Sequence, residues 1–195
     1  MTDPDQAEPL LSSRLRSETR QAHEALDNAI MAARMFDSKM SYGNFLRMQH
    51  AFHGEIDPVY RDARIAEWLP DLADRGRLSD IKADGSDLAI DFKEASGTGI
   101  LPSDAAERLG WLYVAEGSNL GAAFLIKEAE KLGLSKELGA RHLAGHPDGR
   151  GLHWKRFQSA IDAAPLDPGE KSRVVEGARN AFKRVKRLLE QTLVA

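Results

Sequence analysis

Residues 110–132, GWLYVAEGSNLGAAFLIKEAEKL, carry the strongest structural signal in this chain. The stretch is typical of a helix, yet small residues gather in its middle: Gly117, Ser118, Gly121, Ala122 and Ala123. A glycine inside a helix costs roughly 1 kcal/mol relative to alanine. Two glycines four residues apart leave one stripe of helix backbone bare, so we expect something flat or bulky to approach that backbone.

Two explanations of this bare stripe stay open. A Gly-x-x-x-Gly pattern lets two helices pack closely, which is a purely structural role. Alternatively, the helix lies against the face of a planar ligand. A side chain at Gly117 or Gly121 would then fill the space that the ligand needs.

The composition argues against several classes of protein. At 195 residues the chain has the size of one domain, and its formal charge of -3 argues against a dedicated nucleic-acid-binding protein. The absence of cysteine excludes disulfides, thiolate zinc sites and iron–sulfur clusters. No apolar run approaches the roughly 20 residues of a membrane span. We therefore expect a cytoplasmic protein without nucleic-acid or membrane partners.

Breaks rich in Gly, Pro and Asp divide the chain into helical segments, and strand patterns are nearly absent, which predicts an all-α fold. We expect residues 1–11 to be a disordered acidic tail and residues 12–195 to form a single domain. Residues 83–99 are the least regular part. The predicted helices cover 12–35, 42–55, 61–75 with a break at Pro70, 103–131, a short stretch after Ser135, 152–163 and 168–192.

Several helix ends carry sequence signals. Ser41 is a candidate N-cap, and Gly133 is a candidate C-terminal stop for the glycine-rich helix. The last helix has the clearest start, with Asp167 as N-cap, Pro168 at the first position and Glu170 completing a capping box.

His23 is the histidine whose surroundings point to a ligand. On a helix its face includes Arg16, Arg20, Leu26 and Asp27, which suits an apolar ligand with an anionic rim. Asp27, one turn further on, can hydrogen-bond the ring nitrogen that does not ligate a metal. The alternative is an ordinary helix histidine beside exposed arginines.

The other histidines and the basic residues carry weaker signals. No histidine has a glutamate three residues before it, which argues against a di-iron carboxylate bundle. We expect His50 and His53 to be partly buried and hydrogen-bonded, and His142 and His146 to lie at the surface. The final helix carries a basic stretch that is either solvated or a docking patch for an acidic redox partner: Arg179, Lys183, Arg184, Lys186 and Arg187.

Motifs spread over almost the whole chain carry a resemblance to a known family. They are SETRQAHEALD at 17–27, GWLYVAEGSNLGAAFLIKEA at 110–129, LGARHLA at 138–144, GLHWKRF at 151–157 and VVEGARNAFKRVKRLL at 174–189. Together they resemble bacterial heme oxygenases, in particular the branch found in Pseudomonas and Neisseria. The first motif resembles the proximal helix of that branch, and the second resembles its distal helix.

The resemblance implies a single-domain helical fold that holds heme b between the proximal helix and a kinked distal helix. The implied reaction cleaves heme to biliverdin, CO and ferrous iron, with O2 and electrons as co-substrates. His23 would ligate the iron, with Asp27 as its hydrogen-bond partner. On the distal side, Gly117, Ser118 and Gly121 would crowd the bound O2.

The resemblance also implies roles for residues outside the two main motifs. Gln49 and His53 match positions that hold a distal water network in this branch. The candidates for binding the heme propionates are Arg16, Arg20, Tyr113 and Lys155. The implied partners include an electron donor such as a ferredoxin or a flavin reductase, and a biliverdin-binding phytochrome as one user of the product.

Two positions bear on which carbon of the heme ring is cut. The subgroup that cuts at an unusual position has Asn seven residues before the ligating histidine and Lys at a distal position. This chain has Arg16 and Glu128 there. We therefore expect the usual product, biliverdin IX-alpha. The rival hypotheses are a non-catalytic heme carrier or sensor with the same fold, and a helical protein without a cofactor.

Overall fold

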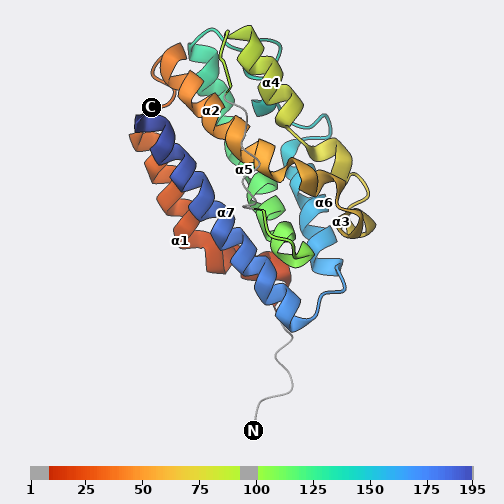
Figure 1. Cartoon of the computed structure of the whole chain (residues 1–195). Coiled ribbons are helices and arrows are strands. Elements are labelled where there is room, and N and C mark those ends of the chain that lie inside the picture. The colour runs from red at the N-terminus through yellow and green to blue at the C-terminus, as the bar shows by residue number, and fades with distance from the viewer. Residues whose placement is uncertain (1–8, 93–100, 195) are drawn as a thin grey trace.

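The computed structural model describes residues 9–92 and 101–194, and this part of the chain is built from helices (Figure 1). The only strand-like features within it are isolated bridges at Ser135. The all-α prediction is therefore confirmed. The α-helices are α1 Leu11–Ala32, α2 Lys39–Ile56, α3 Ala63–Trp68, α4 Leu78–Asp87, α5 Ala105–Lys131, α6 Arg150–Ala163 and α7 Pro168–Val194. Short 3-10 helices are η1 Asp57–Arg61, η2 Leu72–Arg75 and η3 Arg141–Leu143.

Local signals predicted the ends of α5 and α7 well. The Asp167 carboxylate accepts a hydrogen bond from the Glu170 backbone at 2.8 Å, and Glu170 accepts one from the Asp167 backbone at 3.0 Å. This is the predicted capping box. Helix α5 ends just before Gly133, whose φ of +75° is a left-handed conformation that glycine adopts without strain.

Three sequence predictions about secondary structure were wrong. The N-cap of α2 is Ser38, whose hydroxyl accepts a hydrogen bond from the Ser41 backbone at 3.1 Å, so the helix starts earlier than predicted. Residues 83–87 belong to α4, although the rest of the stretch predicted to be irregular reaches beyond the described residues. The short helix predicted after Ser135 is instead a turn that includes Gly139 at φ +75°.

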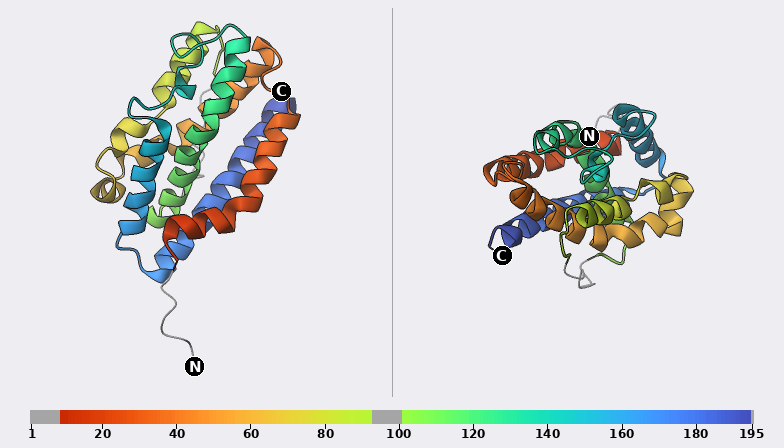
Figure 2. Two further views of the ribbon diagram at one scale, coloured as in Figure 1. Left: turned by 180° about the vertical axis from the view of Figure 1, so that it is seen from behind. Right: turned by 90° about the horizontal axis from the view of Figure 1, so that it is seen from above.

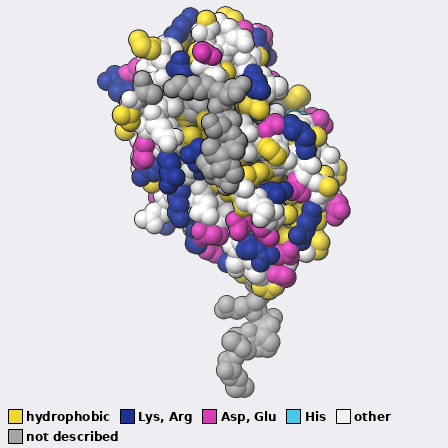
Figure 3. All heavy atoms as spheres, viewed as in Figure 1, with side chains coloured by type: hydrophobic (Ala, Val, Ile, Leu, Met, Phe, Trp, Pro, Cys, Tyr) yellow, Lys and Arg dark blue, Asp and Glu magenta, His cyan; other side chains and the backbone are white. Residues whose placement is uncertain are grey.

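The predicted N-terminal tail falls mostly on residues 1–8, which lie outside the described part of the chain. Helix α1 starts at Leu11, one residue before the predicted boundary of the domain. No helix in the described residues is long and apolar enough to cross a membrane. On the face drawn in Figure 3, acidic and basic side chains are intermixed.

Close helix packing by glycine occurs where α5 crosses α7. A Cβ atom added at Gly110 would lie 2.0 Å from the Val174 carbonyl oxygen, and one at Gly177 would lie 2.1 Å from the Glu107 carbonyl oxygen. The two backbones therefore touch at this crossing. Leu46 of α2, Leu112 of α5 and Val174 of α7 are fully buried in the core around these helices.

Figures 1 and 2 show α1 and α7 side by side and running in the same direction as α5. This arrangement places the proximal segment, on α1, and the glycine-rich segment, on α5, in parallel.

Candidate functional site

The contact between α1 and α5 centres on Tyr113. The pKa of Tyr113 is raised by burial, while a hydrogen bond with Thr19 and the positive charge of Arg16 act to lower it. Arg16 is thus near enough to Tyr113 for its charge to act on the phenol, and both residues are predicted to bind propionates. A guanidinium and a phenol at one place are suitable donors for a carboxylate.

His23 and Gly117 each lie one helical turn beyond this contact. His23 follows Thr19 by four residues, and Gly117 follows Tyr113 by four, a rise of about 6 Å in each case. Because α1 and α5 run in the same direction (Figure 2), the predicted iron ligand and the bare stripe lie at the same level of the two helices. The geometry therefore suits a ligand held between them.

The His23 ring is oriented by two neighbours. Its Nδ1 atom lies 3.1 Å from Asp27 Oδ2, and its edge meets the Phe182 ring of α7 at a centroid distance of 5.8 Å. The side chain is nevertheless 57% exposed. Since Asp27 engages Nδ1, the Nε2 atom is the one that can ligate a metal.

Gly121 of the bare stripe does not serve helix packing among the described residues. A Cβ at Gly121 would meet no neighbouring heavy atom of the described residues within 4 Å, and one at Gly117 would only touch the Trp154 ring at 3.6 Å. Phe124, further along the same face, is 52% exposed. Exposed backbone beside exposed apolar side chains fits the face of a flat apolar ligand. The packing explanation applies at Gly110 instead.

A small cavity lies on the distal side, between α2, α5 and the segment after it. Gln49 and His53 of α2 and Ser118 of α5 line it, as do Arg77 and His142. The predicted residues Gln49, His53 and Ser118 are therefore brought together. The cavity has a volume of about 30 Å³, which is enough for ordered water, since one water needs roughly 10–15 Å³.

Two histidine nitrogens in this cavity lack a protein partner. His53 Nδ1 and His142 Nε2 are buried and make no hydrogen bond to the described residues. Buried polar atoms of this kind are usually satisfied by water. Burial, followed by the charges of His142 and Arg77, lowers the pKa of His53 to about 3, so this side chain is neutral near pH 7.

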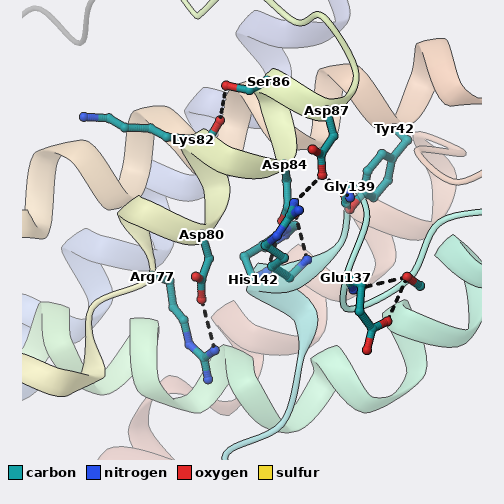
Figure 4. A network of polar contacts seen from close by, with 12 residues as sticks. Tyr42, Arg77, Asp80, Lys82, Asp84, Ser86, Asp87, Glu137, Gly139 and His142 are labelled. Carbon is teal, nitrogen blue, oxygen red and sulfur yellow. Dashed lines mark hydrogen bonds and ion pairs between the residues drawn. The ribbon is translucent and has the colours of Figure 1, made fainter.

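The surface position predicted for His142 was wrong. Its backbone N–H donates to Asp84 Oδ2 at 3.0 Å, and its Nδ1 lies 2.7 Å from the same oxygen (Figure 4). Burial alone would raise the pKa of Asp84, but hydrogen bonds from His142 and Arg141 hold it below its usual value. The missed signal was distant in sequence, because Asp84 lies 58 residues before His142.

The remaining predicted residues show few contacts. Arg20 is strongly exposed and reaches Glu24 at 3.9 Å, and Lys155 is exposed on α6 beside Trp154. His50 is buried and its ring stacks on Phe92 at a centroid distance of 4.1 Å, in place of the predicted side-chain hydrogen bond. In the basic stretch of α7, Arg184 is not solvated but pairs with Glu55.

The described residues hold no cluster of three or more His, Cys, Asp or Glu side chains suited to a metal ion. A single histidine is enough for heme, because the porphyrin supplies the other nitrogen ligands of the iron. The lone exposed His23, the bare stripe opposite and the cationic end at Arg16 together fit that group.

A family model, a related sequence and a solved structure that match this chain are all heme oxygenases. The family model described as heme oxygenase matches residues 10–191. Heme oxygenase PigA from Pseudomonas aeruginosa is 38% identical over 185 residues, which cover 94% of this chain and 93% of PigA. The NO- and CO-bound heme oxygenase structure from Neisseria meningitidis is 40% identical with a TM-score of 0.90, covering 96% of this chain and 94% of that one.

More distant structures share the fold alone. Heme oxygenase from Leptospira interrogans is 14% identical with a TM-score of 0.79, covering 94% of this chain and 100% of that one. Heme oxygenase-1 from Synechocystis in complex with heme is 17% identical with a TM-score of 0.74, covering 94% of this chain and 92% of that one. The resemblance to the Pseudomonas and Neisseria branch is confirmed by the closer matches. This chain belongs to the heme oxygenase family and is a heme-degrading oxygenase.

Proposed function

We propose that this chain binds heme b between α1 and α5, with His23 as the iron ligand, and cleaves it to biliverdin IX-alpha, CO and ferrous iron. The observation that supports the proposal is the open backbone at Gly121, where an added Cβ would meet none of the described residues within 4 Å. Heme is both the substrate and the group that supplies the iron for the chemistry. The protein's part is to position the ring and to deliver protons.

On the proximal side, Asp27 fixes the tautomer of His23. A carboxylate 3.1 Å from Nδ1 favours a proton on that nitrogen, which leaves Nε2 as a neutral donor to the iron. Phe182 limits rotation of the ring from the other side. Both contacts restrict the His23 ring and leave the side chain 57% exposed.

On the distal side, Gly117, Ser118 and Gly121 leave room for the ring and restrict the space beside it. The Ser118 hydroxyl is turned back to its own helix, where it donates to the Ala115 carbonyl at 2.7 Å. No charged acid therefore comes from this stripe. A strong acid close to the iron would favour O–O cleavage over oxidation of the ring.

Protons reach the distal side through water held by Gln49, His53 and His142. Asp84 holds the proton of His142 on Nδ1, which makes Nε2 an acceptor for a water in the cavity. His53 stays neutral because its pKa is about 3. Neutral groups and water supply protons one at a time, as oxidation of the ring requires.

The position of the cut follows from how the propionates are held. Arg16 and Tyr113 are the donors that we favour, because the charge of Arg16 acts on the Tyr113 phenol, with Arg20 and Lys155 as further candidates. Glu128 pairs with Lys131 at 2.6 Å and offers no donor to a propionate. We therefore assign the usual alpha opening to this chain.

The rival function, a heme carrier or sensor without turnover, has no observation in its favour. Its test is reconstitution with hemin followed by ascorbate or a reductase system. We expect the Soret band to decay, with biliverdin IX-alpha as the main isomer on HPLC. A Soret band that survives reduction would support the carrier, and a beta or delta isomer would overturn the assignment of the cut.

The partners stay at the level of chemical class. The reaction needs an electron donor such as a ferredoxin or a flavin reductase, and a biliverdin-binding phytochrome is one consumer of the product. Lys183, Lys186 and Arg187 are exposed on α7 and form the part of the basic stretch that is free to meet an acidic partner. We propose a cytoplasmic location, where such donors occur.

A further inference from the structure

Glu116, the residue directly before the bare stripe, lies at the centre of a buried polar cluster. Its side chain is 2% exposed and accepts a hydrogen bond from Arg75 Nη1 at 2.7 Å. The Arg75 side chain is itself fully buried. The Tyr60 hydroxyl donates to the second oxygen of Glu116 at 3.4 Å, and His153 Nδ1 lies 3.9 Å from the carboxylate. We call these four residues the Glu116 cluster.

The Glu116 cluster joins four separate elements at one point of α5. Tyr60 belongs to η1, Arg75 to η2 and His153 to α6, so α5 is held from three sides. Arg75 is itself fixed, because its Nε and Nη2 atoms donate to the two oxygens of Asp71 at 2.9 Å each. Its guanidinium carbon also lies 5.9 Å from the centre of the Phe157 ring. Arg75, the ion-pair partner of Glu116, is therefore held in one position by its other contacts.

Helix α6 makes two contacts with the segment after Glu116: Arg150 Nη1 donates to the Asn119 carbonyl oxygen at 2.8 Å, and the Trp154 ring lies beside Gly117. Glycine weakens a helix, and none of the described residues lies within 4 Å of a Cβ added at Gly121. Upstream, the backbone of α5 meets that of α7 at Gly110, almost two turns before Glu116. A buried ion pair is costly to form and is a poor source of stability by itself. The position of the Glu116–Arg75 pair beside the stripe therefore suggests that the pair fixes geometry.

We propose that Glu116 is a positioning residue that sets where Gly117–Gly121 lies over the heme. It touches neither substrate nor cavity water but acts through the backbone of α5. This inference rests on the proposed function, since the position of the stripe matters only when heme is bound between α1 and α5. In active sites a misplacement of 1 Å can cost about a hundredfold in rate.

The test compares Glu116→Gln with Glu55→Gln in the full chain loaded with hemin. Glu55 is the matched control because it makes a similarly buried pair, with Arg184, between α2 and α7 and away from the stripe. We expect Glu116→Gln to bind hemin but to change the spin-state bands of the ferric complex. We also expect it to mix the biliverdin isomers and to lower kcat by about tenfold to a hundredfold. Glu55→Gln keeps the wild-type spectrum and isomer.

A purely stabilising role would lower Tm in both variants and leave the spectrum and the isomer ratio alone. That outcome overturns the proposal. If Glu116→Gln does not fold, Tyr60→Phe decides, because it removes only the 3.4 Å hydrogen bond and keeps the ring. We expect a smaller change in the same direction, and an unchanged spectrum with an unchanged isomer ratio contradicts us. Wild-type protein that makes no biliverdin would instead overturn the proposed function.

Discussion

At the scale of single residues, His23 is the proposed iron ligand. Its side chain is 57% exposed, so His23→Ala should change the free energy of unfolding by no more than about 0.5 kcal/mol. The same change should abolish the histidine-ligated spectrum of the hemin complex and all turnover. Added imidazole should restore the spectrum. A ligated spectrum in the variant without imidazole would show that another residue holds the iron.

Asp27 is a residue whose effect should appear only through His23. Asp27→Asn keeps the size of the side chain but weakens the hydrogen bond to Nδ1. Loss of such a partner typically costs about tenfold to a hundredfold in metal affinity or activity. We expect a loss in that range, together with a shift of the iron–histidine stretching band in resonance Raman spectra. Asn28 is the exposed neighbour on α1, and Asn28→Ala should leave both quantities unchanged.

At the scale of elements, α5 contains glycines with two different purposes. Gly110 meets the backbone of α7, so Gly110→Ala should cost about 3 kcal/mol or more in urea unfolding, because backbone cannot give way as a side chain does. Gly121→Leu meets open space and should leave the apoprotein as stable as wild type. It should nevertheless weaken hemin binding and turnover. Full activity in Gly121→Leu would show that no ligand lies against this stripe.

The same contrast separates what sequence can predict from what it cannot. The capping box at Asp167 and the stop at Gly133 are local, and both were predicted correctly. Helix α4 and the turn after Ser135 depend on each other instead. Asp84 accepts hydrogen bonds from backbone 57 and 58 residues away, and a Cβ at Gly85 would collide with Phe92. Patterns within either segment do not contain these contacts.

The candidate site divides in the same way. His23 and the glycine stripe stand out in the sequence because each lies on one helix with a regular pattern. His142 did not stand out, because what buries it is Asp84 on another helix. The Glu116 cluster was missed for the same reason, since its four members come from four elements. Polar residues such as these are usually exposed, so the sequence alone does not predict their burial.

At the scale of the whole molecule, buried histidines make stability depend on pH. Burial lowers the pKa of His53 to about 3 and that of His153 to about 4, from 6.5 for a free side chain. The unfolded chain therefore binds protons between these values and 6.5 while the folded chain does not. The free energy of unfolding should fall as the pH drops below 6.5.

Urea unfolding between pH 7.5 and about pH 4.5 measures this dependence, within the window set by those pKa values. His53→Asn keeps a polar group in the cavity but removes one of the histidines whose pKa burial lowers. Its stability curve should be flatter than that of the wild type below pH 6.5. Parallel curves for the two proteins would show that His53 is not held neutral by burial.

The central claim is that heme bound between His23 and the bare stripe is opened by this chain. The most direct measurement is the product of one turnover of the hemin complex, with CO trapped by a ferrous globin and the bilin separated by HPLC. We predict equal amounts of CO and biliverdin IX-alpha from wild type and neither from His23→Ala. Reduction and oxygenation of a correctly ligated wild-type complex that released no CO and no bilin would contradict the account.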